Sequence, residues 1–332
     1  MSPDPTSILV LRYSALGDAV LATAVLDPLR ERFPGARIEW VTGPAYAPLL
    51  EGLPQLAAVH RLDRGLGNAL ALRERLRGRF DLAVDLQHKV RSALVARAAA
   101  PRLVTFRRRT IGEAALTLIG RNPPITRAHA TALYAEALRP LGIERPGRLH
   151  VHLSEAARAL AGEALGSARA PLVALAPGAS RNTKRWAPER FAEVAEALHR
   201  DGHGVVLAGG PGDREALDAF RAACRVPVAA DLTALPVEGL GAALARVRLL
   251  VACDSGPVHL ASAVGTPVLA LFGPTSATRW GPAPPGRALA LGLTCSPCTN
   301  HGGDRCPEGH HRCMGDLGAA AVTAAAREML AR

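Results

Sequence analysis

The sequence predicts an α/β protein built from two doubly wound, Rossmann-like parallel sheets. Short apolar runs alternate with amphipathic helical segments along the chain, and this order builds parallel sheets covered by helices on both faces. The length of 332 residues suits two domains of ordinary size. Several apolar runs end in a Gly-containing turn directly before a helix, which is where open α/β sheets bind ligands.

In the first half, a strand at residues 7–12 leads into a helix at 18–33. The remaining predicted strands are residues 38–42, 57–62, 82–86 and 102–106, and the remaining helices are residues 66–77, 89–99 and 129–140. In the second half, the predicted strands are residues 171–176, 205–208, 249–252 and 267–272, and the helices include residues 154–165, 214–223, 237–247 and 316–330. We expect domains at 1–160 and 161–315, followed by a terminal helix at 316–332.

The stretch LLVACDSGPVHLASAVGTPVLALFGP at residues 249–274 organises the second half. A buried strand stops at Asp254, and a helix begins at once. Ser255 suits the N-cap and Gly256 lets a ligand approach the backbone. The amides and dipole at such a helix end attract phosphate. His259 follows one turn later on the same face as Ser255. An ordinary βαβ unit with a hydrogen-bonded histidine is the alternative.

Charge is unevenly distributed along the chain. Residues 1–150 contain 22 Lys+Arg and 13 Asp+Glu, a balance of +9 within a total of +11. This suggests an anionic partner for the first half, such as a phosphorylated glycolipid, a membrane surface or nucleic acid. An Arg-rich proteome is the alternative explanation, since Lys89 and Lys184 are the only lysines. No apolar run or signal peptide directs the chain to a membrane or out of the cell, so we expect it in the cytoplasm.

Four of the six cysteines, Cys295, Cys298, Cys306 and Cys313, fall within one short segment that also contains three histidines. In a cytoplasmic protein this pattern favours a structural zinc or iron site over disulfides. Reduced thiols without metal remain the alternative. A Gly-rich turn ending at Asp213, with Glu215 just beyond it, is placed to contact a nucleotide ribose or base. An ordinary tight turn is the alternative.

The string DSGPVHLASAVGTPVLALFGPT resembles the C-terminal signature of glycosyltransferase family 9, the ADP-heptose:lipopolysaccharide heptosyltransferases. This resemblance implies a GT-B-type fold, with two Rossmann-like halves facing across a cleft. It also implies an inverting transfer of heptose from an ADP-activated donor to the inner core of lipopolysaccharide, with no metal or other cofactor needed for catalysis. The enzyme is then expected at the inner face of the inner membrane, and its terminal helix is expected to cross back to the first domain.

The resemblance extends to individual residues. The run Tyr13 to Asp18 resembles the family motif S-x-L-G-D, with Asp18 as the general base; a helix cap is the alternative role for Asp18. The segment 177–188 resembles P-G-A-x-x-x-x-K-x-W-P apart from one inserted residue. The implied donor-binding residues are Ser180, Thr183, Lys184, Asp213, Glu215, Asp254, Ser255, Gly256 and His259. The implied acceptor-binding residues are Ser14, Gly17, Arg91, Arg107 and Arg109, although a solvated arginine cluster is the alternative for the last three.

Other functions fit the sequence less well. An epimerase or a transferase with another donor sugar would use the same scaffold. A nicotinamide enzyme lacks support, because the turn after the first strand is not G-x-G-x-x-G. We expect no nucleic-acid partner, because only 4% of residues are aromatic and no nucleic-acid-binding motif is present.

Overall fold

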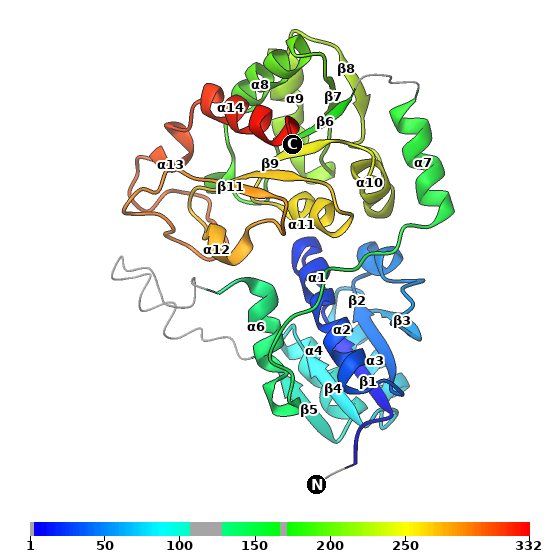
Figure 1. Cartoon of the computed structure of the whole chain (residues 1–332). Coiled ribbons are helices and arrows are strands. Elements are labelled where there is room, and N and C mark those ends of the chain that lie inside the picture. Colours follow the sequence, from blue (N-terminus) through cyan, green and yellow to red (C-terminus); the bar gives the residue numbers. More distant parts are fainter. Residues whose placement is uncertain (1–2, 107–127, 167–170) are drawn as a thin grey trace. The chain divides into compact units, whose positions relative to one another are not determined.

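The computed structural model describes residues 3–106, 128–166 and 171–332, and the chain divides into two compact units (Figure 1). Among these residues, unit 1 holds 3–106 and 130–152, and unit 2 holds 128–129, 153–166 and 171–332. The division thus falls ahead of the expected boundary at residue 160. The reason is that helix α7 (Glu155–Leu165) packs against α10 (Val237–Leu244) of unit 2.

Unit 1 contains a five-stranded parallel sheet with the order β3-β2-β1-β4-β5. This is a Rossmann-type order, and the direction of winding reverses between β1 and β4. The strands are β1 (Ser7–Leu11), β2 (Arg37–Thr42), β3 (Ala58–Arg61), β4 (Leu82–Asp85) and β5 (Arg102–Thr105). The helices are α1 (Leu16–Ala22), α2 (Leu26–Arg32), α3 (Leu66–Leu76), α4 (Val90–Ala99) and α6 (Ala130–Ala137), with short 3₁₀ helices at Thr23–Val25, Pro44–Leu49 and Arg139–Leu141.

Both faces of this sheet are buried. Leu9 and Leu11 of β1 pack in one cluster with side chains of α3 and α4. The alternate residues Ile8 and Val10 point to the other face and are also fully buried. Continuous apolar strands of this kind are typical of parallel sheets covered by helices on two sides.

Unit 2 contains a six-stranded parallel sheet with the order β11-β10-β9-β6-β7-β8. Its winding reverses between β6 and β9, so it repeats the topology of unit 1. The strands are β6 (Leu172–Ala176), β7 (Gly204–Leu207), β8 (Val228–Asp231), β9 (Leu249–Cys253), β10 (Val268–Leu271) and β11 (Arg287–Leu289). The predicted class, two Rossmann-like α/β units, is confirmed.

Helices cover unit 2 as the amphipathic patterns predict. Beyond α7 and α10, they are α8 (Pro188–Arg200), α9 (Arg214–Ala223), α11 (Gly256–Ala263), α12 (Ala277–Trp280), α13 (Arg312–Gly315) and α14 (Ala319–Leu330), with 3₁₀ turns at Asn182–Lys184 and Pro211–Asp213. The terminal helix α14, expected to cross back to the first domain, packs against α8 and β9 within unit 2 (Figure 1). Its apolar stripe, which includes Val322 and Ala326, is buried in that core. Within the described residues, no helix is long and apolar enough to cross a membrane.

Candidate functional site

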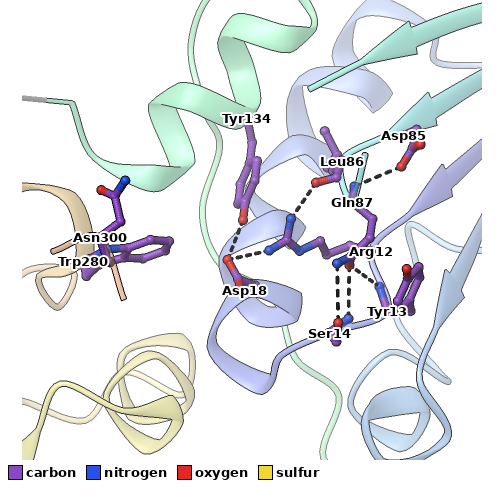
Figure 2. A network of polar contacts seen from close by, with 10 residues as sticks. All are labelled: Arg12, Tyr13, Ser14, Asp18, Asp85, Leu86, Gln87, Tyr134, Trp280 and Asn300. Carbon is purple, nitrogen blue, oxygen red and sulfur yellow. Dashed lines mark hydrogen bonds and ion pairs between the residues drawn. The ribbon is translucent and has the colours of Figure 1, made fainter. Parts of the chain in front are cut away.

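Asp18 lies at the point in unit 1 where the winding of the sheet reverses. It belongs to the first turn of α1, whose N-cap is Ala15, so it does not act as the capping residue. Its Oδ1 atom is 2.6 Å from Nη2 of Arg12 and accepts a 2.9 Å hydrogen bond from the hydroxyl of Tyr134 (Figure 2). An adjacent guanidinium favours the ionised form of a carboxylate, which is the form a general base needs.

The turn that carries Ser14 is held by the end of β4. The side-chain oxygen of Gln87 accepts hydrogen bonds from the amides of Tyr13 and Ser14, at 3.2 and 3.3 Å (Figure 2). Asp85 in turn fixes Gln87, because Oδ1 of Asp85 accepts a 3.0 Å hydrogen bond from the backbone amide of Gln87. Burial raises the pKa of Asp85, against hydrogen bonds from His88, Ser92 and Gln87 that lower it. The run Asp85-Leu86-Gln87 therefore anchors the turn before Asp18.

A cavity of about 680 Å³ opens beside this turn within unit 1. Ser14 and Arg91, both expected to bind the acceptor, line it together. The guanidinium of Arg91 lies over the ring of Tyr13 at 4.7 Å, and Nη1 donates to the backbone oxygen of Asp63 at 3.0 Å. Gly17 lies in α1, next to Asp18. Arg107 and Arg109, the other expected acceptor residues, lie outside the described residues.

In unit 2, Lys184 and Asp254 meet where β6 and β9 end. The two residues come from the turns that follow these neighbouring strands, and Nζ of Lys184 lies 2.9 Å from Oδ2 of Asp254. The pair is largely buried, with 11% and 6% of the two side chains exposed. Thr275, after β10, donates a 2.6 Å hydrogen bond to the same Asp254 oxygen. Sequence reasoning missed this contact of Thr275, although Thr275 is the last residue of the string that resembles the family signature.

Helix α11 begins beside this pair. Ser255 occupies its N-cap position, but its hydroxyl donates to the Cys253 carbonyl at 3.0 Å and makes no side-chain cap. Ser255 therefore occupies the expected N-cap position of α11, but its hydroxyl is turned toward the Cys253 carbonyl two residues earlier and does not accept a helix amide. Gly256 is the first helical residue, and His259, one turn later, is 4% exposed.

Thr183 ties the Lys184 turn to the cysteine-rich segment. Its hydroxyl donates to the Gly303 oxygen at 2.9 Å and accepts from the Gly303 amide at 2.8 Å. The aliphatic part of the Lys184 side chain packs against Gly302. A Cβ atom added at Gly302 would lie 2.7 Å from the Lys184 side chain. In this arrangement the hydroxyl proton of Thr183 is committed to Gly303, so Thr183 fixes the loop that surrounds Lys184.

The other expected donor residues are spread along the same edge of the sheet. Ser180 is exposed in the turn after β6. Asp213 accepts the Gly210 amide at 3.0 Å and lies so close to Gly178 that any side chain there would collide with it. Glu215 is 85% exposed and pairs with Arg185 at 2.9 Å. Asp213 thus packs closely against the turn after β6, whereas Glu215 lies at the surface.

The four cysteines of the C-terminal segment line one small cavity, together with His310 and His311. Burial and the neighbouring thiols raise the pKa of Cys298 to about 11, and burial also raises the pKa of Cys313. Across the described residues, no three His, Cys, Asp or Glu side chains converge into a metal-ligand set. All four thiols are free of disulfides.

Two Rossmann-type units, each with polar groups where its winding reverses, place the chain in the class of two-domain α/β proteins that bind ligands at such points. Glycosyltransferase family 9 (heptosyltransferase) matches residues 69–307, and the chain belongs to this family. It is therefore a glycosyltransferase.

Similar proteins agree with this assignment. Lipopolysaccharide heptosyltransferase 3 of Escherichia coli K12 is 29% identical over 292 residues, which cover 82% of this chain and 83% of that protein. The solved structure of ADP-heptose LPS heptosyltransferase II from E. coli is similar with a TM-score of 0.76 and 24% identity, and 98% of each chain is covered. A glycosyl transferase family 9 structure from Veillonella parvula DSM 2008 has a TM-score of 0.81 and 24% identity, covering 98% of this chain and 97% of that one.

Proposed function

We propose that this glycosyltransferase transfers L-glycero-D-manno-heptose from ADP-heptose to the inner core of lipopolysaccharide, with inversion at the anomeric carbon and without a catalytic metal ion. The observation that carries the proposal is the buried Lys184–Asp254 pair beside the α11 N-terminus. A cation and helix amides placed together suit a sugar diphosphate. The donor and acceptor are inferred from the names of the heptosyltransferase relatives.

In the proposed reaction, an acceptor hydroxyl attacks the anomeric carbon of the donor. The new carbon–oxygen bond forms as the bond to the diphosphate breaks, which inverts the configuration. Asp18 takes the hydroxyl proton, since a carboxylate within hydrogen-bond reach can act as the general base for an alcohol nucleophile. ADP leaves with its negative charge stabilised by Lys184 and the amides at Gly256.

The charge on Lys184 replaces a metal ion in this scheme. Asp254 holds the ammonium group in place, and Thr275 holds Asp254. A diphosphate brings more negative charge than one carboxylate, so it competes with Asp254 for the ammonium group as it binds. Ser180, Asp213, Glu215 and His259 are proposed to contact the ribose, the phosphates or the donor sugar from the same edge.

The cavity beside Ser14 is proposed to receive the acceptor. Arg64 and Arg91 bring positive charge to it, and Asn68 and two tyrosines bring groups that hydrogen-bond and stack on sugars. Forked contacts from arginine suit the carboxylates and phosphates of an anionic core oligosaccharide. Gly17 and the two undescribed residues Arg107 and Arg109 complete the proposed acceptor set.

We further propose that unit 1 docks on an anionic membrane surface in the cytoplasm, where a lipid-linked acceptor is located. Five large apolar side chains are exposed among the described residues, and three of them are in unit 1. These are Leu66, Leu70 and Val90, whose exposed fractions are 53%, 40% and 73%. They lie at the starts of α3 and α4, beside the exposed Lys89. Apolar and basic groups together suit an anionic bilayer. Replacing all three with Ser should reduce sedimentation with phosphatidylglycerol vesicles, whereas Leu160→Ser in unit 2 should not.

We also propose a structural metal ion, zinc or iron, for the four cysteines. A four-thiolate set suits either tetrahedral ion, and all four thiols line one cavity. Binding would require them to lose protons and draw together. The Thr183–Gly303 contacts connect this segment to the Lys184 turn, so its role would be to support the fold of the donor site.

A donor screen tests the main proposal. The purified protein is given ADP-heptose, ADP-glucose and UDP-sugars with a heptose-deficient lipopolysaccharide acceptor, and products are followed by mass spectrometry. Transfer from ADP-heptose in the presence of EDTA, with the opposite anomeric configuration in the product, is expected. Turnover of a UDP-sugar with none from ADP-heptose would exclude the heptose assignment. Loss of all activity in EDTA that added Mg²⁺ restores would exclude transfer without a catalytic metal ion.

A further inference from the structure

Tyr134 reaches the candidate base from a distant part of the chain. It lies on α6, is 2% exposed, and donates its hydroxyl to Oδ1 of Asp18 at 2.9 Å (Figure 2). The rings of Phe106 and Tyr134 pack in an edge-to-face arrangement with a centroid distance of 5.4 Å. A buried tyrosine usually directs its hydroxyl to a polar partner, and here that partner is the carboxylate.

Arg12 approaches the same oxygen from the end of β1. Its Nη2 lies 2.6 Å from Oδ1 of Asp18, and its Nη1 donates to the Leu86 carbonyl at 2.6 Å. Its guanidinium carbon also lies 5.4 Å from the centre of the Tyr134 ring. The contact with Leu86 limits the freedom of the guanidinium independently of Asp18, so the position of Arg12 is set by the end of β1 and by the backbone that follows β4.

We propose that Arg12 and Tyr134 are positioning residues for catalysis, which fix the rotation of the Asp18 carboxylate and hold it ionised for proton transfer. This inference rests on the proposed role of Asp18 as the base. Because both donors converge on one carboxylate oxygen, the direction of the other oxygen is determined as well. Orientation of a catalytic group within fractions of an ångström strongly affects the rate.

The charged groups around Arg12 within unit 1 support its role as a positioning residue for Asp18. Burial alone would lower the pKa of Arg12, but electrostatic interactions with Tyr134, Asp18 and Asp85 and the contact with the Asp18 carboxylate outweigh it and raise that pKa, so Arg12 keeps its proton. Asp85 faces Arg12 from the end of β4. Glu136 lies two positions beyond Tyr134 on α6, a spacing that places it on another face of the helix. Arg12 and Tyr134 therefore both act directly on the carboxylate from within unit 1.

The test is the pH dependence of kcat/KM, which reports the ionisation of the free enzyme. Tyr134→Phe removes one hydrogen bond to the carboxylate and keeps the ring. The acidic limb of the kcat/KM profile of this variant should move upward by about one pH unit, because a hydrogen bond to a charged group usually contributes a free energy of this size. The Kd of ADP should change less than about twofold, because the substitution is expected to affect proton transfer and not the binding of the nucleotide. Phe106→Leu loosens the packing of the same ring, so it should lower Tm without moving the limb.

Arg12→Lys keeps the charge but loses the forked geometry. We therefore expect a lower kcat at the plateau, with a smaller shift of the acidic limb than in Arg12→Gln.

Asp18→Asn separates the base role of Asp18 from the positioning role of Arg12 and Tyr134. If Asp18→Asn is inactive and Tyr134→Phe leaves the acidic limb unchanged, the positioning role is excluded while the base remains. If Asp18→Asn turns over normally, the base assignment itself fails, and the positioning role fails with it.

Discussion

The ammonium group of Lys184 lies 2.9 Å from Oδ2 of Asp254, so two turns far apart in the sequence meet in one buried ion pair. Each residue comes from a different motif, and the adjacency of β6 and β9 brings them together. The pair couples the stability of unit 2 to the donor site, because a largely buried charge without its partner is costly.

Lys184→Met should therefore weaken ADP binding and also lower the free energy of unfolding by about 3 kcal/mol, since Asp254 would remain as a buried, uncompensated charge. Adding Asp254→Asn removes that charge and should recover most of the stability but none of the affinity. Calorimetric titration and urea unfolding measure the two effects separately. Unchanged ADP affinity in Lys184→Met would exclude its contact with the diphosphate.

Asp18→Asn should reduce transfer by about 10²- to 10⁴-fold, because the amide keeps the shape of the side chain but cannot accept the proton. Donor affinity should be preserved. Asp81→Asn is a matched control, since Asp81 lies at the opposite end of β4 and binds Thr6 and Ser7. It should affect stability and leave transfer intact. Single-turnover rates with ADP-heptose distinguish these results, and near-normal transfer by Asp18→Asn would contradict its role.

Arg91→Met should raise KM for the acceptor by about tenfold, because it removes a charge-assisted contact in the cavity beside Ser14. KM for the donor should stay the same. Arg97→Met, an exposed arginine on the same helix, provides the control. Equal acceptor KM values in the two variants would argue against the acceptor cavity.

The hydrogen bonds of Asp27 predict that this residue contributes to the stability of unit 1 in a pH-dependent way. It binds His150 at 2.8 Å and the Arg148 amide at 3.1 Å. Burial alone would raise its pKa, but these hydrogen bonds and charges outweigh it and lower the pKa. A depressed acid pKa adds stability above the unfolded value of about 3.9, and this is lost as pH falls through the folded pKa.

Asp27→Asn should accordingly lower the free energy of unfolding by about 1 kcal/mol at neutral pH. The difference from the unsubstituted protein should shrink as the pH falls below about 4, where the native carboxylate is protonated as well. Urea unfolding at a series of pH values measures this. A difference independent of pH would show that the carboxylate charge contributes nothing.

Protein purified without added metal should contain about one zinc or iron per chain by elemental analysis if the four cysteines bind it. Replacing Cys298 and Cys313 with Ser should remove the metal, whereas Cys224→Ser, a cysteine outside the segment, should retain it. The absence of stoichiometric metal from the unsubstituted protein would leave the thiols as packing groups.

The sequence alone determined the local structure and most of the motif chemistry. Alternating strands and helices predicted two Rossmann-like units, because short apolar runs and the 3.6-residue helical period depend only on neighbouring residues. The strand–turn–helix at Asp254 was predicted for the same reason. The first-half motif also indicated Asp18 as the candidate base.

Tertiary structure decided which distant residues meet. Tyr134 and Arg12 gave no signal of their contact with Asp18, because they reach it from α6 and from the end of β1. Thr183 resembled a phosphate ligand in its motif, yet its hydroxyl is bonded to Gly303. Hydrogen bonds between side chains far apart in the chain depend on how strands order within a sheet and where loops return, and local pattern does not encode that order.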